Sequence, residues 1–174
     1  MQRTRVAVVG LGNVGRGAAE ALATSPDFEL AGVVRRRAQP GVRVAGPNWE
    51  APAVTRIDQL DKVRAALMCV PTRELEPMEH ALLRSGISVV DTFDIHGDPL
   101  LRHKQSLAAS AAQGQATAVI AAGWDPGADS VIRALLEIIA PTGITYTNFG
   151  PGMSMGHSVA VRAIPGVEIG RAHV

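Results

Sequence analysis

Short apolar runs alternate with longer amphipathic segments along the chain, and this alternation predicts the order of its elements. Runs of apolar, largely β-branched residues are typical of buried strands, whereas apolar positions spaced three and four residues apart are typical of helices. The pattern predicts strands over residues 5–9, 29–34, 65–70, 87–90, 116–121 and 144–149. It predicts helices over residues 14–23, 57–64, 74–85, 100–113 and 129–139, with Gly86 and Gly114 closing two of them. Residues 35–52 are interrupted by prolines and glycines and are predicted to form a loop.

Strands that alternate with helices predict an α/β fold with a parallel, doubly wound sheet of the Rossmann type and right-handed crossovers. Ligands of such sheets bind beyond the carboxyl ends of the strands. The notable polar and glycine positions of this chain fall at those ends, namely residues 10–15, 35–37 and 71–73, Asp94 and Asp125. We therefore expect a single ligand site along one edge of the sheet.

Three glycines follow the first predicted strand at the spacing G-x-G-x-x-G. Gly10 allows a tight turn, Gly12 has no Cβ to obstruct a pyrophosphate, and Gly15 lets the next helix pack closely. The N-terminus of that helix then offers free N–H groups and a partial positive charge to the phosphates. The alternative is a glycine-rich turn without a ligand, but the position between strand and helix favours a dinucleotide site.

Three consecutive arginines, Arg35, Arg36 and Arg37, follow the second predicted strand. Sites for a free ribose 2′-OH usually carry an acidic residue there, whereas guanidinium groups suit a 2′-phosphate through charge and paired hydrogen bonds. The sequence therefore favours NADP over NAD. The alternative is a solvated basic loop.

Asp94 and Asp125 end two different predicted strands, near the expected nicotinamide end of the cofactor. Two carboxylates there suit a cationic amine, since hydride leaves the carbon only after the amine has lost a proton, which a carboxylate can accept. Each aspartate could instead cap a helix or form a turn, and Asp129 fits a helix N-cap better than a site. His96 and His157 are candidate polar ligands, with hydrogen-bonded structural roles as the alternative.

Composition narrows the class of protein further. Of 174 residues, 47% are hydrophobic and only 3% aromatic, which predicts an aliphatic core, and the net charge of +1 argues against nucleic acid or membrane surfaces as partners. The single cysteine, Cys69, lies in an apolar run and is expected in the core. No ligand spacing indicates a metal site, and no signal peptide or membrane span is predicted, so a cytoplasmic location is expected.

Five segments together resemble the meso-diaminopimelate dehydrogenase family. They are VVGLGNVGR at residues 8–16, DTFDIHGD at 91–98, GWDPG at 123–127, FGPGMSMGHS at 149–158 and AIPGV at 163–167. The resemblance implies oxidative deamination of the D-centre of meso-2,6-diaminopimelate with NADP, giving L-2-amino-6-oxopimelate and ammonium. The substrate implied is thus a small molecule.

The resemblance also implies roles for individual residues. Asp94 and Asp125 would be the catalytic pair that holds the reacting centre. The implied substrate-binding set is Asp94, Asp98, Trp124, Asp125, Phe149, Met155 and Gly156. The implied cofactor-binding set is Gly10, Gly12, Asn13, Val14, Gly15, Arg35, Arg36, Arg37, Pro71, Thr72, Arg73 and His96.

Phe149 and Met155 are more similar to a subgroup of the family that also accepts other D-amino acids. A broad D-amino-acid dehydrogenase is therefore one alternative activity. A second alternative, from another class, is an NADP-binding module without catalysis, which would not need Asp94 or Asp125.

The resemblance extends to about Val167 and implies a longer, homodimeric enzyme. We expect residues 1–122 to form the NADP-binding domain and residues 123–168 to begin an α+β substrate and dimerisation domain. Residues 169–174 do not resemble the family and are expected to be a non-native tail. We accordingly expect the 174 residues alone to show no deamination.

Overall fold

A seven-stranded sheet forms the centre of the protein, in the order β3-β4-β2-β1-β5-β6-β7. The computed structural model describes residues 3–125, 127–144, 153–154, 164–166 and 172–173. The strands of the sheet are β1 (Thr4–Val9), β2 (Phe28–Val34), β3 (Arg43–Gly46), β4 (Trp49–Val54), β5 (Ala65–Met68), β6 (Ser88–Asp91) and β7 (Ala118–Val119). Every neighbouring pair is parallel except β3 and β4, which confirms the doubly wound α/β class.

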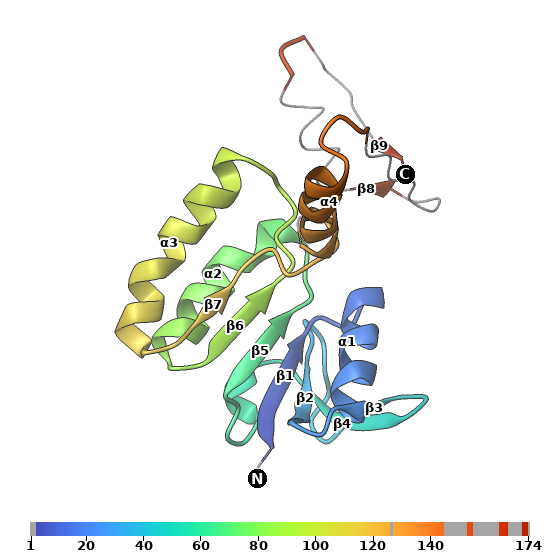
Figure 1. Ribbon diagram of the computed structural model, residues 1–174. Coiled ribbons are helices and arrows are strands. Elements are labelled where there is room, and N and C mark those ends of the chain that lie inside the picture. Colours follow the sequence, from blue (N-terminus) through green and yellow to red (C-terminus); the bar gives the residue numbers. More distant parts are fainter. Residues whose placement is uncertain (1–2, 126, 145–152, 155–163, 167–171, 174) are drawn as a thin grey trace.

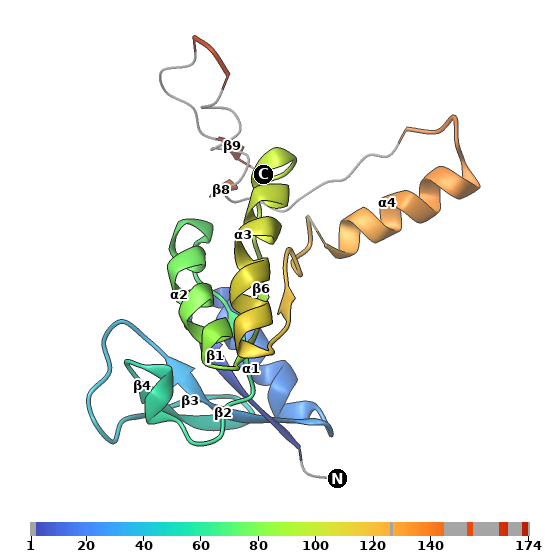
Figure 2. The same ribbon diagram turned by 90° about the vertical axis from the view of Figure 1, so that its left-hand side faces the viewer.

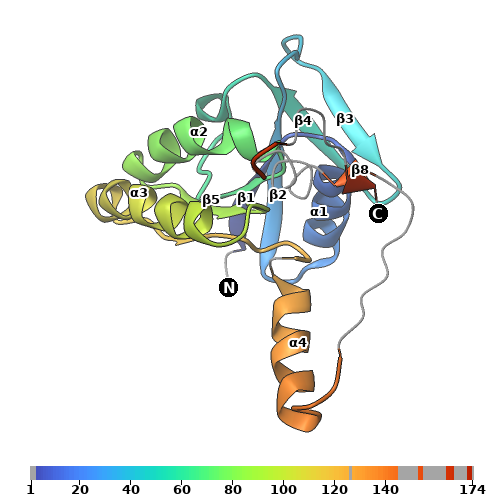
Figure 3. The ribbon, with the colours of Figure 1, turned by 90° about the horizontal axis from the view of Figure 1, so that it is seen from above.

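Helices cover both faces of this sheet. They are α1 (Asn13–Thr24), α2 (Thr72–Arg84) and α3 (Asp98–Gly114). A further helix, α4 (Ala128–Ile139), and a 3-10 turn over Ile57–Gln59 also belong to the described chain. Seen from above, α1 lies on one side and α2 and α3 lie together on the other (Figure 3). Two short strands, β8 (Met153–Ser154) and β9 (Ala172–His173), pair antiparallel outside the main sheet.

The core is split by the sheet, because successive side chains of a strand point to opposite faces. Val8 packs with Ala19 and Leu22 of α1, whereas Val9 packs with the cluster that contains Leu75 of α2. Most of the buried side chains are aliphatic, as the low aromatic content predicts.

The strand order reverses at β1, where the chain turns first toward β2 and later toward β5 on the other side. Backbone bonds fix this junction: the N–H of Gly10 donates to the carbonyl of Val34 (2.9 Å), and the N–H of Cys69 donates to that of Val9 (2.8 Å). The carboxyl ends of the three strands therefore meet at one edge, where Rossmann-type sheets bind their ligands. In Figure 1 this edge faces α4, and the N-terminus lies at the opposite end.

The predicted loop over residues 35–52 is wrong in its second half, which forms the β3–β4 hairpin. Trp49, Ala51 and Ala53 are buried at alternate positions, the period expected of a strand. Pro52 is compatible with this strand because the ladder between β4 and β2 begins only at Ala53. The prolines that suggested a loop therefore lie either outside the paired residues or, like Pro52, at a position compatible with strand pairing.

Three other local predictions change. The helix expected over residues 57–64 is only the 3-10 turn, and the strand expected over 116–121 shortens to β7. Gly86 closes α2 at φ +80°, as predicted, but Gly114 does not close α3, since Gln115 takes the left-handed conformation (φ 50°). Gly114 is required for contact instead, because a Cβ there would lie 1.7 Å from the Leu83 carbonyl oxygen. The strand expected over 144–149 lies almost wholly outside the described residues.

Helix α4 projects away from the sheet (Figure 2). Its large apolar side chains are exposed, among them Val131, Ile132, Leu135, Leu136, Ile138 and Ile139. Such a contiguous apolar surface marks a site for further protein contact. None of the helices that the structure describes has the length and hydropathy needed to cross a bilayer.

Candidate functional site

A cavity of about 430 Å³ opens at the reversal point of the sheet. It is lined by residues at the ends of β1, β2, β4 and β5 and by the N-terminal half of α2, namely Val9, Gly10, Leu11, Gly12, Val34, Arg35, Arg36, Thr55, Cys69, Val70, Pro71, Glu74 and Met78. The sequence placed the cofactor at this edge, and the structure brings the glycine loop, two of the arginines and Pro71 together there.

The glycine loop has the close packing that its spacing predicts. Gly10 has φ +93°, and a Cβ on it would lie 2.4 Å from the Cys69 carbonyl oxygen. A Cβ on Gly15 would lie 2.1 Å from the Gly10 carbonyl oxygen, so α1 can start this close to the loop only with glycine. A Cβ on Gly12 would meet no atom of the described residues within 4 Å, which leaves room beside the cavity.

Helix α1 begins directly behind this loop. Gly12 is its N-cap, and within the described chain no side chain caps the first turn, so the N–H groups at Asn13 and Val14 are available. Both residues are exposed. Loop, open space and helix N-terminus together fit the pyrophosphate of a dinucleotide.

Arg35 and Arg36 line the cavity, whereas Arg37 is exposed and is not part of its lining. The guanidinium of Arg36 donates to a carboxylate oxygen of Glu74 at 2.5 Å. Glu74 belongs to the first turn of α2, where an acidic residue favours the helix dipole. Sequence reasoning missed Glu74, because its pairing with Arg36 spans 38 residues.

A second cavity, of about 310 Å³, shares Val70 and Pro71 with the first. It brings four predicted site residues together, namely Pro71, Thr72, Arg73 and Asp94. The Thr72 hydroxyl donates a hydrogen bond to the Asp94 carboxylate. Asp94 thus lies next to the cofactor cavity, at the carboxyl end of β6.

Asp125 occupies a different electrostatic setting. Arg133 of α4 donates to its Oδ2 at 2.9 Å, and Nε2 of His96 lies 3.8 Å from its Oδ1. Arg133 also contacts Asp129 at 2.5 Å, and the hydrogen bond that its guanidinium donates to the Asp129 carboxylate is the main cause that raises the pKa of Arg133. Asp129 and Arg133 are four residues apart on one helix, a spacing that could have revealed Arg133 in the sequence. The structure therefore places His96 beside Asp125 and leaves it out of both cavity linings.

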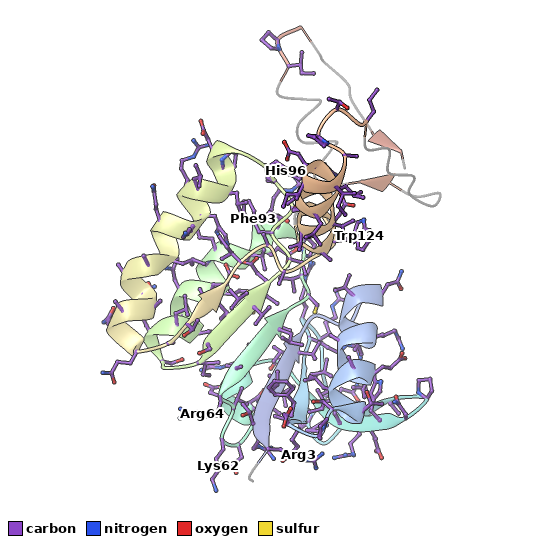
Figure 4. All side chains as sticks on the ribbon, viewed as in Figure 1. Arg3, Lys62, Arg64, Phe93, His96 and Trp124 are labelled. Carbon is purple, nitrogen blue, oxygen red and sulfur yellow. The ribbon has the colours of Figure 1, made fainter. Side chains whose placement is uncertain are left out.

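The other predicted substrate residues are placed unevenly. Trp124 is 51% exposed, and Figure 4 shows it with Phe93 and His96 near the start of α4. Asp98 is the exposed first residue of α3, where a carboxylate also stabilises the helix dipole. Phe149, Met155, Gly156 and His157 lie outside the described residues.

Cys69, expected in the core, is partly buried and lines the first cavity. Burial raises the pKa of its thiol to about 11. At neutral pH it is therefore a neutral, apolar side chain at the cofactor cavity.

Three titratable side chains that sequence reasoning missed form a buried cluster. Glu79 of α2, Asp91 of β6 and His103 of α3 are each at most 4% exposed, with ligating atoms within 4.8 Å of one another. Nε2 of His103 lies 2.9 Å from Asp91 Oδ2 and 3.3 Å from Glu79 Oε2. Glu79 lies on the same face of α2 as Leu75, Leu82 and Leu83. A carboxylate among apolar residues at helical spacing is the sequence feature that could have revealed this buried residue.

The environments of the two buried carboxyls push their pKa values apart. Burial, followed by the charge of Asp91, raises the pKa of Glu79 to about 8. Burial also acts to raise the pKa of Asp91, but hydrogen bonds from His103 and from the backbone at Phe93 and Ala121 outweigh it and lower that pKa. At neutral pH Glu79 is therefore the neutral acid and Asp91 the carboxylate.

Two family models match the chain. Residues 4–91 match the oxidoreductase family with an NAD-binding Rossmann fold, and residues 123–174 match the diaminopimelic acid dehydrogenase C-terminal domain.

Relatives and solved structures agree with these matches. The chain is 50% identical to a meso-diaminopimelate D-dehydrogenase of Bacteroides fragilis, over 97% of this chain and 55% of that protein. It superimposes with a TM-score of 0.71 and 31% identity on the Corynebacterium glutamicum DAP dehydrogenase in complex with DAP, covering 97% of this chain and 51% of that one. An engineered D-amino acid dehydrogenase bound to NADP+ gives the same TM-score, identity and coverage. The chain thus spans about half the length of the relatives it matches, and the resemblance found in its sequence is confirmed.

Proposed function

Because the chain belongs to the oxidoreductase family with an NAD-binding Rossmann fold, we propose that it serves the NADP-dependent oxidative deamination of meso-2,6-diaminopimelate at its D-centre. The products are L-2-amino-6-oxopimelate and ammonium. The observation that carries this proposal is the 50% identity to a meso-diaminopimelate D-dehydrogenase over nearly the whole chain. The two adjoining cavities supply a physical reason, since one fits a dinucleotide and the other contains a carboxylate.

The cofactor proposed is NADP, with the pyrophosphate at Gly10, Gly12 and the start of α1. Arg36, which lines the same cavity, would bind the 2′-phosphate, and Arg37 follows it on the exposed loop. A guanidinium–phosphate pair is charged and can be bidentate, whereas a 2′-hydroxyl offers neither advantage. An NADP+ complex of a protein with the same fold supports this choice.

NADP, held by the glycine loop and Arg36, would supply the hydride acceptor for the D-carbon of the substrate. The residues of the chain prepare the substrate for that step. The Asp94 carboxylate takes a proton from the substrate ammonium, which frees the lone pair needed to form the imine, and the Thr72 hydroxyl orients that carboxylate. Asp125, oriented by Arg133, attracts the cationic amine. Water then adds to the imine carbon, and ammonium leaves as the carbonyl forms.

A broad D-amino-acid dehydrogenase is the second candidate activity. The superposition on an engineered D-amino acid dehydrogenase favours it. The two activities share Asp94 and Asp125 and differ in the groups that receive the far end of diaminopimelate.

The proposal includes the division into a cofactor domain over residues 1–122 and the beginning of a substrate domain over residues 123–168. It also includes a homodimer, for which the exposed apolar side chains of α4 offer a surface. Light scattering of the complete gene product would test the dimer.

The test of the function is a rate measurement on the complete gene product. NADPH formation is followed with meso-diaminopimelate and, in parallel, with D-alanine. Turnover that needs NADP and prefers meso-diaminopimelate supports the proposal, and equal rates on both amines support the broader dehydrogenase. Tight NADP binding without turnover on either amine would leave only a nucleotide-binding module and overturn the enzyme assignment.

A further inference from the structure

The carboxylate of Asp91 joins the two segments from which Asp94 and Asp125 extend. Its Oδ1 accepts hydrogen bonds from the N–H of Phe93 at 2.9 Å and from the N–H of Ala121 at 2.7 Å. Its backbone carbonyl accepts a third bond, from Ala122, at 2.8 Å. Asp94 follows Phe93 directly, and Asp125 lies three residues beyond Ala122. One buried residue, Asp91, therefore fixes the backbone position from which both segments continue.

The second of these segments needs such a restraint. Ala121 has φ 56°, the left-handed conformation that is unfavourable for a residue with a Cβ. The bond from its N–H to Asp91 is charge-assisted, and such bonds are stronger than those between neutral groups. The strained turn that leads into the Trp124–Asp125 loop is therefore held by this contact.

The Asp91 carboxylate is in turn held by His103 of α3 and Glu79 of α2. The His103 ring donates to the second oxygen of Asp91 and stacks on Phe93, with ring centroids 4.3 Å apart at 12°. Glu79 is fully buried, and among the described residues neither of its oxygens accepts a hydrogen bond of normal geometry. A protonated Glu79 explains this arrangement, because a neutral carboxyl can donate its proton to Asp91.

Within the described part of the chain, the other polar groups near Glu79 are engaged elsewhere. Glu76 of the same helix is exposed and His80 is half-buried; Nδ1 of His80 bonds the Ser110 hydroxyl of α3 at 2.8 Å, and its Nε2 lies 3.7 Å from the Glu76 carboxylate. His103 faces Glu79 from α3 at 3.3 Å, and the Asp91 carboxylate faces it from β6, within 4.8 Å. An ionised Glu79 would thus confront a second buried carboxylate.

We propose that Glu79, as a neutral acid, and His103 are positioning residues that lock the Asp91 carboxylate onto the backbone at Phe93 and Ala121, and thereby set Asp94 and Asp125 for the amine chemistry. The second half of this statement rests on the proposed function. The first half concerns the fold of the chain and is tested without any substrate.

The substrate-free test follows the backbone amides of Phe93 and Ala121 by NMR on 15N-labelled protein, from about pH 6 to about pH 10. Both amides should shift together in one transition as Glu79 ionises. Glu79→Gln should abolish the transition while both amides stay slow to exchange with solvent, because a glutamine amide still donates to Asp91. His103→Gln should accelerate exchange at Ala121 by roughly tenfold or more.

Glu76→Gln is the matched control, since it removes one carboxylate three residues away on the same helix and should leave the transition in place. A transition that persists in Glu79→Gln would overturn the proposal. So would a zinc-induced shift of both amides that Glu79→Gln abolishes, because the cluster would then be a metal site.

The catalytic half is tested on the complete gene product. His103→Gln should lower kcat by roughly ten- to a hundredfold with the KM for NADP unchanged, since a small misplacement of reacting groups has effects of that size. An equal loss in kcat and in NADP affinity would reduce the cluster to a general structural role. If the unmodified protein fails to deaminate, the proposed function falls while the NMR result still decides the positioning.

Discussion

Arg36 and Glu74 form an ion pair of 2.5 Å between the end of β2 and the first turn of α2, and both side chains line the cofactor cavity. Arg36 is 79% exposed, so the pair itself contributes little to stability. The ion pair instead bears on the choice of nucleotide, because a 2′-phosphate would compete with the Glu74 carboxylate for the guanidinium of Arg36.

For the arginines, we predict that their replacement lowers the selectivity for NADP over NAD. Replacing Arg36 and Arg37 by alanine together should weaken NADP binding by at least about tenfold, because each lost charged hydrogen bond costs about 1.5–3 kcal/mol. NAD, which lacks the 2′-phosphate, should be affected far less. Fluorescence titration with both nucleotides measures this, with Arg43→Ala on the neighbouring hairpin as a control. Equal losses for the two nucleotides would contradict the assignment.

For Glu74, the same competition predicts tighter NADP binding when the carboxylate is removed. Glu74→Gln releases Arg36 and removes a negative charge beside the expected phosphate, so NADP should bind roughly two- to fivefold more tightly, the scale of an exposed ion pair. The gain should shrink at high salt, which screens exposed charges. The same titration measures it, and weaker NADP binding would show that Glu74 itself contacts the cofactor.

Asp94 and Asp125 should affect catalysis without affecting cofactor binding. In the complete gene product, Asp94→Asn and Asp125→Asn each remove a carboxylate from the amine and should lower the deamination rate by roughly a hundredfold or more. NADP affinity should stay within about twofold of the unmodified value, because neither residue lines the first cavity. Unchanged deamination in both variants would assign these aspartates to turn and cap formation.

Cys69 provides a probe of the cavity that needs no substitution. Since burial raises the pKa of its thiol to about 11, alkylation by iodoacetamide should be slow at neutral pH and should accelerate about tenfold per pH unit below that value. NADP should slow it further, because Cys69 lines the cavity. The protein has one cysteine, so mass spectrometry gives the labelled fraction directly, with urea-unfolded protein as the fast reference. Labelling that NADP leaves unchanged would place the cofactor elsewhere.

Glu79 predicts how stability varies with pH. Its pKa is raised from about 4.5 to about 8, so the folded state holds a proton that the unfolded state releases within that window. The free energy of unfolding contributed by Glu79 is therefore full below about pH 4.5 and is lost as pH rises to about 8. Glu79→Gln, which has no proton to lose, should gain stability relative to the unmodified protein between about pH 5 and pH 8. Urea unfolding at both ends of the window measures the difference, and parallel pH profiles would contradict it.

Several features of this protein were determined by the sequence itself. The buried strand at residues 5–9, the glycine spacing of Gly10, Gly12 and Gly15 and the helix behind them are local, because each depends on contacts a few residues apart. The alternation of strands and helices then predicted a parallel sheet and the edge at which the candidate site lies. The hairpin over residues 43–54 was also encoded locally, in the alternation of Trp49, Ala51 and Ala53, but prolines and glycines obscured it.

Only the tertiary structure decided which side chains meet. Arg36 reaches Glu74 across 38 residues, and Asp91 reaches Ala121 across 30, distances over which composition and periodicity carry no pairing information. The charge of a group also depends on this assembly, since Glu79 is neutral only because folding removes it from water and places Asp91 beside it. The sequence therefore determines where the polar residues lie along the strands and helices, whereas folding determines their neighbours, their burial and their protonation.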